Sequence, residues 1–215
     1  EAVNYGLTHE VLDHDGKHFQ YKDVPMELRP LQEPHPPIWY PSSNPDVAPI
    51  IGEGGYNFVT LGGMENAKKS IDNYKEGYAK RGGPSGPALD FPGGTAIGIS
   101  RHIVVGETMD EAMRIAEPAY SRWHTSLMKL WVDNKVEGPA FARSILKDVQ
   151  SAIEIGTDIV GDPATVAAEI ERQIEELGVN YMICQFYFGN MTHEDAMRSL
   201  ELFSTEIMPK VSALG

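Results

Sequence analysis

The sequence predicts an α/β fold built from parallel βα repeats, arranged either as half of a closed eight-stranded barrel or as a small open sheet. Short apolar runs alternate with helical patterns about four times along the chain. Strands separated by helices are parallel, because a parallel pair requires a crossover connection. Each run is apolar throughout, as expected of a strand covered on both faces. Both architectures use this unit, and a complete barrel needs about 250 residues.

Composition favours one globular domain over residues 1–215. Of the 215 residues, 41% are hydrophobic, which is enough to fill a sizeable core. The net charge of −13 repels nucleic-acid phosphates and anionic lipids, so neither is expected as a partner. The single cysteine, Cys184, lies in an apolar run and excludes an intrachain disulfide, which favours the cytoplasm. No apolar stretch approaches the roughly 18 residues of a transmembrane helix, and we expect a soluble protein.

The N-terminal region precedes the repeats. The chain starts at Glu1 rather than Met, and its opening residues read as the end of a helix, so we expect the true N-terminus to be missing. Residues 13–31 are expected to form a hairpin excursion, because Asp15-Gly16 is a turn signal followed by a strand-like run. A proline cluster then leads in extended form into a first strand at residues 38–40.

The first repeat continues with a helix and a second strand. Pro45 follows three small polar residues and suits the first helical position. The helix is expected to end by Gly52 or Gly54, with the second strand at residues 57–61. Its expected buried face comprises Val47, Ile50 and Ile51.

The next units follow the same order. Residues 64–80 form a helical pattern that a glycine- and proline-rich loop terminates. Residues 96–105 are the third strand, and Thr108 with Glu111 forms a capping box that opens another helix. Residues 121–157 interrupt the rhythm and are expected to be a helical insertion.

The C-terminal part resumes the repeat. Asp162 caps a helix that ends at Gly178, and residues 179–188 form the fourth strand. Thr192 caps the last helix. The expected buried stripe of that helix comprises Ala196, Leu200, Phe203 and Ile207.

The sequence contains GKHF at 16–19, PLQEPHPPIW at 30–39, GDP at 161–163 with its helix, FGNMTHE at 188–194, and the run from Leu202-Phe203 to Pro209. In their order and spacing across nearly the whole chain, these segments resemble luciferase-like flavin-dependent monooxygenases, the family of bacterial luciferase.

The resemblance implies the C-terminal half of a TIM barrel. Such barrels bind reduced flavin, which is FMN or in some branches the deazaflavin F420, and commonly use oxygen on a small organic substrate. Members normally have about half a barrel before the position of Glu1. The resemblance therefore implies that this chain alone is incomplete and inactive, with its catalytic residues upstream.

Ser42, Ser43 and Asn44 are the first candidate cofactor residues. They follow a strand and precede a helix, where unpaired N–H groups and the helix dipole favour an anion. Helix capping is the simpler interpretation of such residues. The resemblance favours a flavin-phosphate contact, because the family places a Ser/Thr-rich phosphate contact after the corresponding strand. Prolines at 41 and 45 leave the individual contacts open.

Thr60, Leu61 and Gly62 are the second candidate segment. Glycine lets a flat ring approach the backbone, and a threonine hydroxyl is suited to a ring heteroatom. An ordinary strand-to-helix turn is the equal alternative.

The remaining motifs give weaker signals. The seven histidines form no recognisable ligand pair, so no metal is expected. Gly52-Glu53-Gly54-Gly55 follows a helix and precedes a strand, the reverse of a phosphate loop. Arg101 and His102 are expected to point to opposite faces of their strand, and His193 is expected in the first turn of the last helix.

Three functional hypotheses remain. The leading one is a monooxygenase that uses reduced FMN and oxygen, and the absence of Lys and Arg from residues 39–57 favours FMN over the more anionic F420. The second is F420-dependent oxidoreduction on the same scaffold. The third is a non-catalytic half-barrel that pairs with another chain, because open strand edges and an apolar face need a cover. We expect a dimer or association with the missing half.

Overall fold

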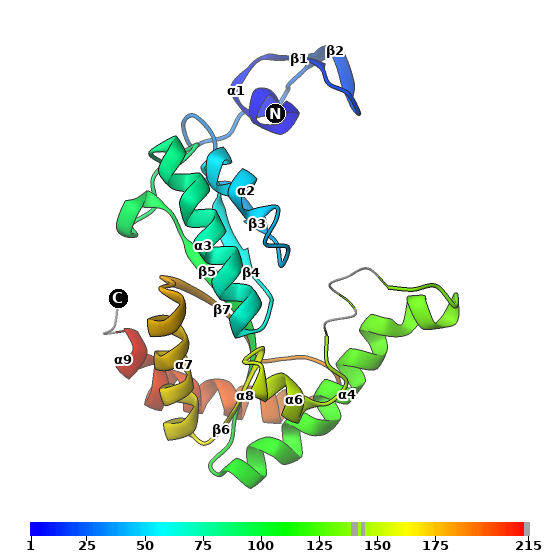
Figure 1. The fold of residues 1–215 in the computed structure, drawn as a ribbon, viewed down its shortest axis with the longest axis vertical. Helices are drawn as coiled ribbons and strands as arrows, with labels where there is room; N and C mark the ends of the chain where they lie inside the picture. The colour runs from blue at the N-terminus through cyan, green and yellow to red at the C-terminus, as the bar shows by residue number, and fades with distance from the viewer. Residues whose placement is uncertain (139–141, 143–144, 213–215) are drawn as a thin grey trace.

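The computed structural model describes residues 1–138, 142 and 145–212, and it shows a parallel sheet flanked by helices (Figure 1). The sheet order is β3-β4-β5-β6, with β7 also paired to β5. All of these pairings are parallel. The strands are β3 (Trp39–Pro41), β4 (Asn57–Thr60), β5 (Ile97–Val105), β6 (Asp158–Gly161) and β7 (Tyr181–Gln185). The predicted α/β fold with parallel repeats is confirmed, and the sheet is open within the described residues.

The long strand β5 organises the sheet. Its first half pairs with β4, and its second half pairs with β6. His102 pairs with Asp158 of β6 and with Gln185 of β7. A residue has only two strand edges, so β6 and β7 lie on opposite sides of β5. Strand β4 shares the β6 side, since both β4 and β7 pair with the segment around Gly98 and Ile99.

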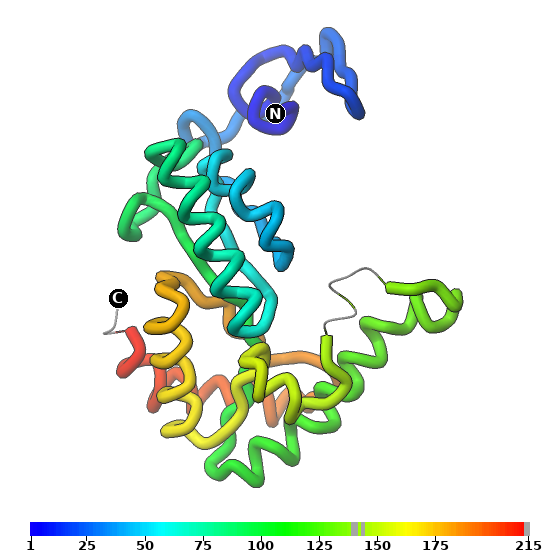
Figure 2. The backbone as a smooth tube through the Cα atoms, viewed as in Figure 1, coloured from blue at the N-terminus to red at the C-terminus, as the bar shows by residue number. Residues whose placement is uncertain are grey.

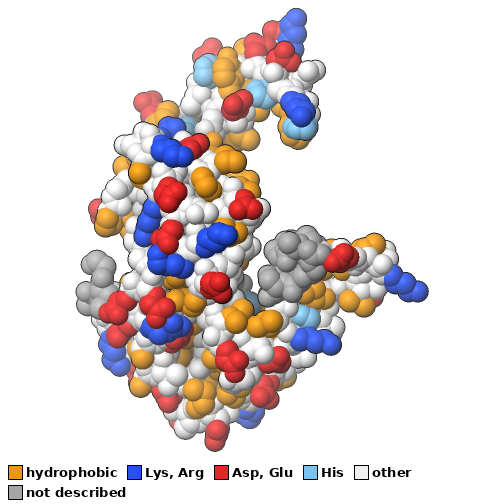
Figure 3. Space-filling view, viewed as in Figure 1, with side chains coloured by type: hydrophobic (Ala, Val, Ile, Leu, Met, Phe, Trp, Pro, Cys, Tyr) orange, Lys and Arg blue, Asp and Glu red, His pale blue; other side chains and the backbone are white. Residues whose placement is uncertain are grey.

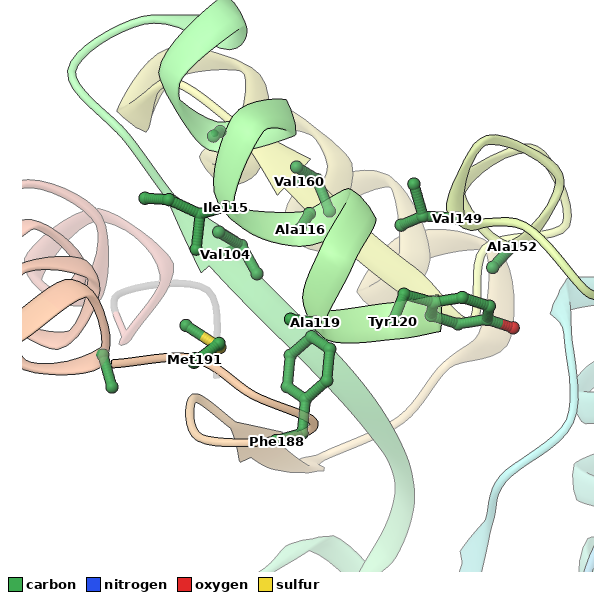
Figure 4. Close-up of a cluster of buried hydrophobic side chains, with 12 residues drawn as sticks. Val104, Ile115, Ala116, Ala119, Tyr120, Val149, Ala152, Val160, Phe188 and Met191 are labelled. Carbon is green, nitrogen blue, oxygen red and sulfur yellow. The ribbon is translucent and has the colours of Figure 1, made fainter. Parts of the chain in front are cut away.

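Helices cover one face of the sheet along its full length and the other face only in part. Side chains on β5 alternate, so Ile99 and Ile103 face one layer of helices while Val104 faces another. The first layer contains α2 (Ala48–Gly54), α3 (Met64–Arg81) and α7 (Pro163–Leu177). On the second face, α4 (Met109–Asp133) and α6 (Val149–Glu154) pack against the ends of β5 and β6. Figure 4 shows Val104, Val160 and Phe188 meeting α4 there.

The chain ends in a composite helix. It consists of α8 (His193–Leu202), a π-helical turn η2 (Phe203–Ile207) and α9 (Met208–Val211). Leu202 and Ile207 are buried against α7 and β5, whereas Leu200 is 40% exposed. Leu200 lies before the π turn, on helix α8, whose buried face comprises Ala196, Ser199 and Leu202. The prediction that Leu200 belongs to the buried stripe is therefore wrong.

The N-terminal residues form an arm beyond the sheet. Helix α1 (Ala2–Thr8) precedes an antiparallel hairpin of β1 (Val11–Asp15) and β2 (Gln20–Pro25). Figure 2 shows the arm leading away from the body of the molecule, and every residue of β2 is exposed. A two-stranded hairpin is marginal in water by itself, so this segment needs contacts that the rest of the described chain does not give it.

Three expected boundaries differ from the structure. Helix α2 begins at Ala48, and Ile50 is 66% exposed because the short helix turns Ala48 and Ile51 inward. Helix α4 runs without interruption through residue 121 to Asp133. Strand β6 was not predicted: its four residues directly follow residues 121–157, the segment expected to be a helical insertion, and directly precede the expected helix cap at Asp162. Part of that segment, residues 139–141 and 143–144, lies outside the described residues.

In the part of the chain that the structure describes, no helix combines the length and apolar character needed to span a membrane.

Candidate functional site

Two predicted segments lie at the same edge of the sheet, at the carboxyl ends of the strands. The β3 residue Pro41 pairs with Val59, and the N–H of Ser42 donates to the carbonyl of Val59 at 2.9 Å. Residues 42–44 therefore leave β3 at the level where residues 61–62 leave β4. In parallel α/β sheets this edge is where ligands bind.

Asn66, in the first turns of α3, connects the two loops. Its side-chain amide donates to the carbonyl of Ser43 at 2.9 Å. Its amide also packs on Gly62, where a side-chain carbon would come within 2.4 Å of Asn66 Nδ2. A second amide, that of Asn73, donates to the carbonyl of Pro45 at 2.9 Å. One helix face thus fixes the position of both loops.

The small polar residues of the first loop do not cap a helix. The hydroxyl of Ser42 accepts from the N–H of Asn44 at 3.2 Å, and Asn44 Oδ1 accepts from the N–H of Asp46 at 3.0 Å. Helix α2 has Val47 at its N-cap with no side-chain cap. The capping interpretation is therefore wrong for this loop, whose hydrogen bonds are internal.

Several hydrogen-bond donors at this edge are free. Among the described residues, the backbone N–H groups of Ser43, Gly62 and Gly63 have no acceptor, and neither does the hydroxyl of Ser43. Ser43 and Gly62 are half-buried, and Leu61 is 49% exposed. Convergent unpaired N–H groups in a loop form an anion-binding concavity.

The Thr60 side chain is buried on the helix-covered face of β4, whereas the side chain of the next residue, Leu61, is exposed. Its side chain shares a face of β4 with Phe58, which packs against Tyr74 of α3. The Thr60 hydroxyl is completely buried and has no partner among the described residues. At the end of β4, the exposed groups are therefore the Leu61 side chain and the Gly62 backbone rather than this hydroxyl.

The buried side chain of Arg101 holds the loop at residues 61–63 through a hydrogen bond to its backbone. Its Nη1 donates to the carbonyl of Gly62 at 3.2 Å, and its Nε donates to Gln173 Oε1 at 2.7 Å. The side chain is fully buried, and burial lowers its pKa to about 10, partly offset by the charges of Asp158 and Glu169. Sequence reasoning expected Arg101 and His102 on opposite faces, and the structure agrees. The contact with Gly62, 39 residues away, was not predictable.

The open face of the sheet carries an aromatic cluster followed by a polar region. Tyr181 lies 4.9 Å from Trp39 and 6.1 Å from Phe91, measured between ring centroids. Gly98 permits this, since a side-chain carbon there would lie 2.9 Å from the carbonyl of Tyr181. Nearer the loops, Gln185 Nε2 donates to Ser100 Oγ at 2.8 Å. Figure 3 shows the surface hollowed between the α2–α3 layer and the projecting end of α4.

Comparison with known proteins shows what this arrangement resembles. The family model for luciferase-like monooxygenases matches residues 1–181. The chain belongs to this family. The resemblance on which the TIM-barrel expectation rested is thereby confirmed, and the open parallel sheet corresponds to part of the family's barrel.

One curated relative is a protein of Sinorhizobium fredii named uncharacterized protein y4wF. It is 29% identical to this luciferase-like chain over 202 residues, which is 93% of the chain and 56% of the relative. This chain therefore spans little more than half the length of that relative.

Solved structures show the same fold. Monooxygenase RslO1 from Streptomyces bottropensis is 20% identical, with a TM-score of 0.70 over 97% of this chain and 58% of its own. The oxygenating constituent of 3,6-diketocamphane monooxygenase from a Pseudomonas putida plasmid, solved with FMN, is 20% identical (TM-score 0.60; 92% and 57%). The coenzyme F420-dependent tetrahydromethanopterin reductase of Methanopyrus kandleri is 18% identical (TM-score 0.67; 97% and 60%).

The other candidate residues of this luciferase-like chain lie apart from the loops. His193 is the exposed first residue of α8, after the Thr192 cap. Gly55 ends α2 in the left-handed conformation, so the glycine-rich run at 52–55 terminates a helix. Over the described residues, no group of three His, Cys, Asp or Glu side chains is placed to hold a metal ion.

Proposed function

We propose that the full-length protein containing this chain is a flavin-dependent monooxygenase that uses reduced FMN and oxygen on a small organic substrate. The family match over residues 1–181 supports the reaction class. For the cofactor, the observation that carries the proposal is that Ser43, Gly62 and Gly63, in two loops that leave the sheet at the same level, have free N–H groups.

The residues at this edge fit a phosphate group. The two loops offer backbone N–H groups and the Ser43 hydroxyl, and no carboxylate lies within residues 42–44 or 60–63. Hydrogen bonds to an anion are shorter and stronger than neutral ones, so a few such donors suffice to hold a phosphate. Asn66 holds the loops in place before the ligand arrives, which reduces the entropy lost on binding.

The flat ring of the flavin would lie beyond the phosphate, over Leu61 and Gly62 and toward the open face. Gly62 has no side chain to obstruct a ring, and the exposed Leu61 offers an apolar contact. When bound, reduced flavin supplies the electrons that activate oxygen. The side chains of this chain bind and orient the ring and limit the access of water to it.

FMN is favoured over F420 by the charge of the first loop. No Lys or Arg occurs within residues 39–57, and a longer anionic tail would gain no cationic partner there. Relatives with FMN and with F420 share this fold, so F420-dependent oxidoreduction is the second candidate.

We further propose that the protein is a cytoplasmic homo-oligomer. In it, residues of the missing half of the barrel or of a second subunit cover the open face of the sheet. Cys184 is half-buried, and burial raises the pKa of its thiol to about 11, so it is suited to packing rather than to disulfide formation. A non-catalytic subunit that pairs with another chain is the alternative for the part described.

Titration of the full-length protein, and of this chain alone, with FMN and with F420 tests the proposal. We expect the full-length protein to bind FMN and this chain alone to bind it much more weakly, because the ring pocket is divided. Tight F420 binding with no FMN binding would support the second candidate. Failure to bind either cofactor would contradict the proposed function.

A further inference from the structure

Asp158, His102 and Gln185 form a polar row across three neighbouring strands. His102 of β5 pairs in register with Asp158 of β6 and with Gln185 of β7. Register partners in parallel strands point to the same face, so the three side chains lie side by side. Ser100, two residues before His102 on the same face, accepts the hydrogen bond from Gln185. None of these residues belongs to the two loops.

The imidazole of His102 is held through one nitrogen. Its Nδ1 lies 3.1 Å from Asp158 Oδ1, and the Asp158 side chain is 2% exposed. A carboxylate accepts from an imidazole N–H, so a neutral His102 ring in this contact carries its proton on Nδ1 and an acceptor lone pair on Nε2. This is the arrangement in which a carboxylate orients a histidine and leaves the second nitrogen for another group.

His102 Nε2 has no hydrogen-bond partner within the described chain and is accessible to solvent. The fully buried polar atoms without a partner are the hydroxyls of Thr60 and Ser70 and one nitrogen of Arg101. Nε2 of His102 is absent from that set and receives no hydrogen bond from the described residues. The nitrogen therefore reaches the molecular surface with an unused acceptor.

The surroundings of the imidazole are aromatic. The Phe188 ring stacks on it at 4.2 Å and the Trp123 ring meets it edge-on at 4.6 Å, between centroids. Ile183 extends the same face and is 40% exposed. An acceptor among rings suits a ligand with an apolar or aromatic body and one hydroxyl donor.

We propose that Asp158 and His102 form a substrate-recognition site in which His102 Nε2 accepts a hydrogen bond from a hydroxyl group on a small aromatic substrate. Asp158 is the positioning residue, because it acts through the imidazole. The register places this site one or two strands from the loops at residues 42–44 and 61–63, or about 5–10 Å at the usual strand spacing. As a description of substrate class, the inference rests on the proposed oxidoreductase function.

A matched pair of ligands tests the site directly. We would titrate flavin-free full-length protein with 4-nitrophenol and with 4-nitroanisole, which differ in the hydroxyl donor. A site built to accept a hydroxyl prefers the phenol by about tenfold. Its absorption band also moves to longer wavelength when the hydroxyl donates to an acceptor stronger than water. Equal affinities, or no binding of the phenol, would overturn the proposal.

Two substitutions separate recognition from structure. His102→Asn retains a donor to Asp158 and removes the acceptor at the Nε2 position, whereas His102→Gln reaches that position with an amide oxygen. We expect the phenol preference to vanish in H102N and to persist in part in H102Q. His193→Asn, on an exposed histidine, is the control and leaves the preference unchanged. A preference that survives in H102N contradicts the proposal.

If the variants fail to fold, the ¹⁵N chemical shift of His102 Nε2 in the wild-type protein tests the site instead. In the wild-type protein, 4-nitrophenol should move this resonance and 4-nitroanisole should not; the absence of a shift would count against the site. Separate FMN titration distinguishes the two proposals. Phenol preference without FMN binding contradicts only the proposed function, and FMN binding without phenol preference contradicts only this inference.

Discussion

Asn66 connects the two loops of the candidate site, although nothing in the sequence marks it as a site residue. One side-chain amide donates to the carbonyl of Ser43 and packs against Gly62, so it relates loops that leave two different strands. The sequence shows Asn66 only as a polar residue of an amphipathic helix. Its partner is 23 residues away, and no local pattern indicates that contact.

Replacing Asn66 by Ala should weaken cofactor binding. The Ser43 carbonyl loses its donor and the loop at residues 42–44 becomes more mobile, so we expect the FMN dissociation constant of the full-length protein to rise about three- to tenfold. Fluorescence titration measures this. Lys69→Ala, at an exposed position of the same helix, is the control. An unchanged dissociation constant in N66A would show that the loop is held by other means.

Residue orientation was predictable where strand periodicity is strong. Arg101 and His102 are neighbours on β5, so the two-residue period places them on opposite faces. The identity of their partners was not predictable, because Gln173 and Asp158 come from elements 72 and 56 residues later in the chain. The Thr60 hydroxyl was proposed as a ring contact from its position at a strand end, but the face on which it lies depends on how β4 packs against α3.

Helix ends show which signals in the sequence are reliable. Thr108, Asp162 and Thr192 cap the helices that were assigned to them, because each side chain accepts from the N–H three residues on. The start of α2 was misplaced at Pro45, since residues 42–46 satisfy their hydrogen bonds within the loop. Strand β6 was missed because four residues between the expected helical insertion and the next helix give too short a pattern.

The cap of α7 should make stability depend on Asp162 at neutral pH. Hydrogen bonds from the backbone N–H and the hydroxyl of Thr165 lower the pKa of Asp162 below its ordinary value. A carboxyl whose pKa is lowered on folding stabilises the protein above its unfolded pKa, and this contribution disappears as pH falls through the folded pKa.

Asp162→Ala should therefore lower the melting temperature by a few degrees at neutral pH, whereas Asp162→Asn should retain most of the cap. The difference between D162A and wild type should decrease in acid below the ordinary aspartate pKa. Thermal unfolding monitored by circular dichroism measures both effects. A deficit in D162A that grows as pH falls would contradict this account.

For the molecule as a whole, the most important feature is the open face of the sheet, where apolar side chains are exposed and need a cover. Trp39, Tyr181 and Ile183 are 39%, 36% and 40% exposed on this face of an otherwise packed sheet. Exposed parallel edges and apolar faces favour association. The repeating pattern in the sequence predicted the parallel sheet, but it did not predict how the arm at residues 1–25 would lie.

We predict that this chain alone self-associates or binds the remaining part of the full-length protein. Light scattering of the chain at increasing concentration should give a mass above that of one copy. Addition of the separately produced remainder of the protein should convert it to a defined complex. A stable monomer that does not bind the remainder would contradict the interpretation of the sheet as part of a larger barrel.

The central claim is that the loops at residues 42–44 and 61–63 bind a flavin phosphate, and a comparison of FMN with riboflavin tests it most directly. The two ligands differ only in the phosphate. Full-length wild-type protein should bind FMN at least about tenfold more tightly than riboflavin, and Ser43→Ala should reduce that ratio about threefold or more by removing one donor. Ser121→Ala, on an exposed serine, should leave it unchanged. Equal affinities for FMN and riboflavin, or a ratio that S43A does not alter, would contradict the claim.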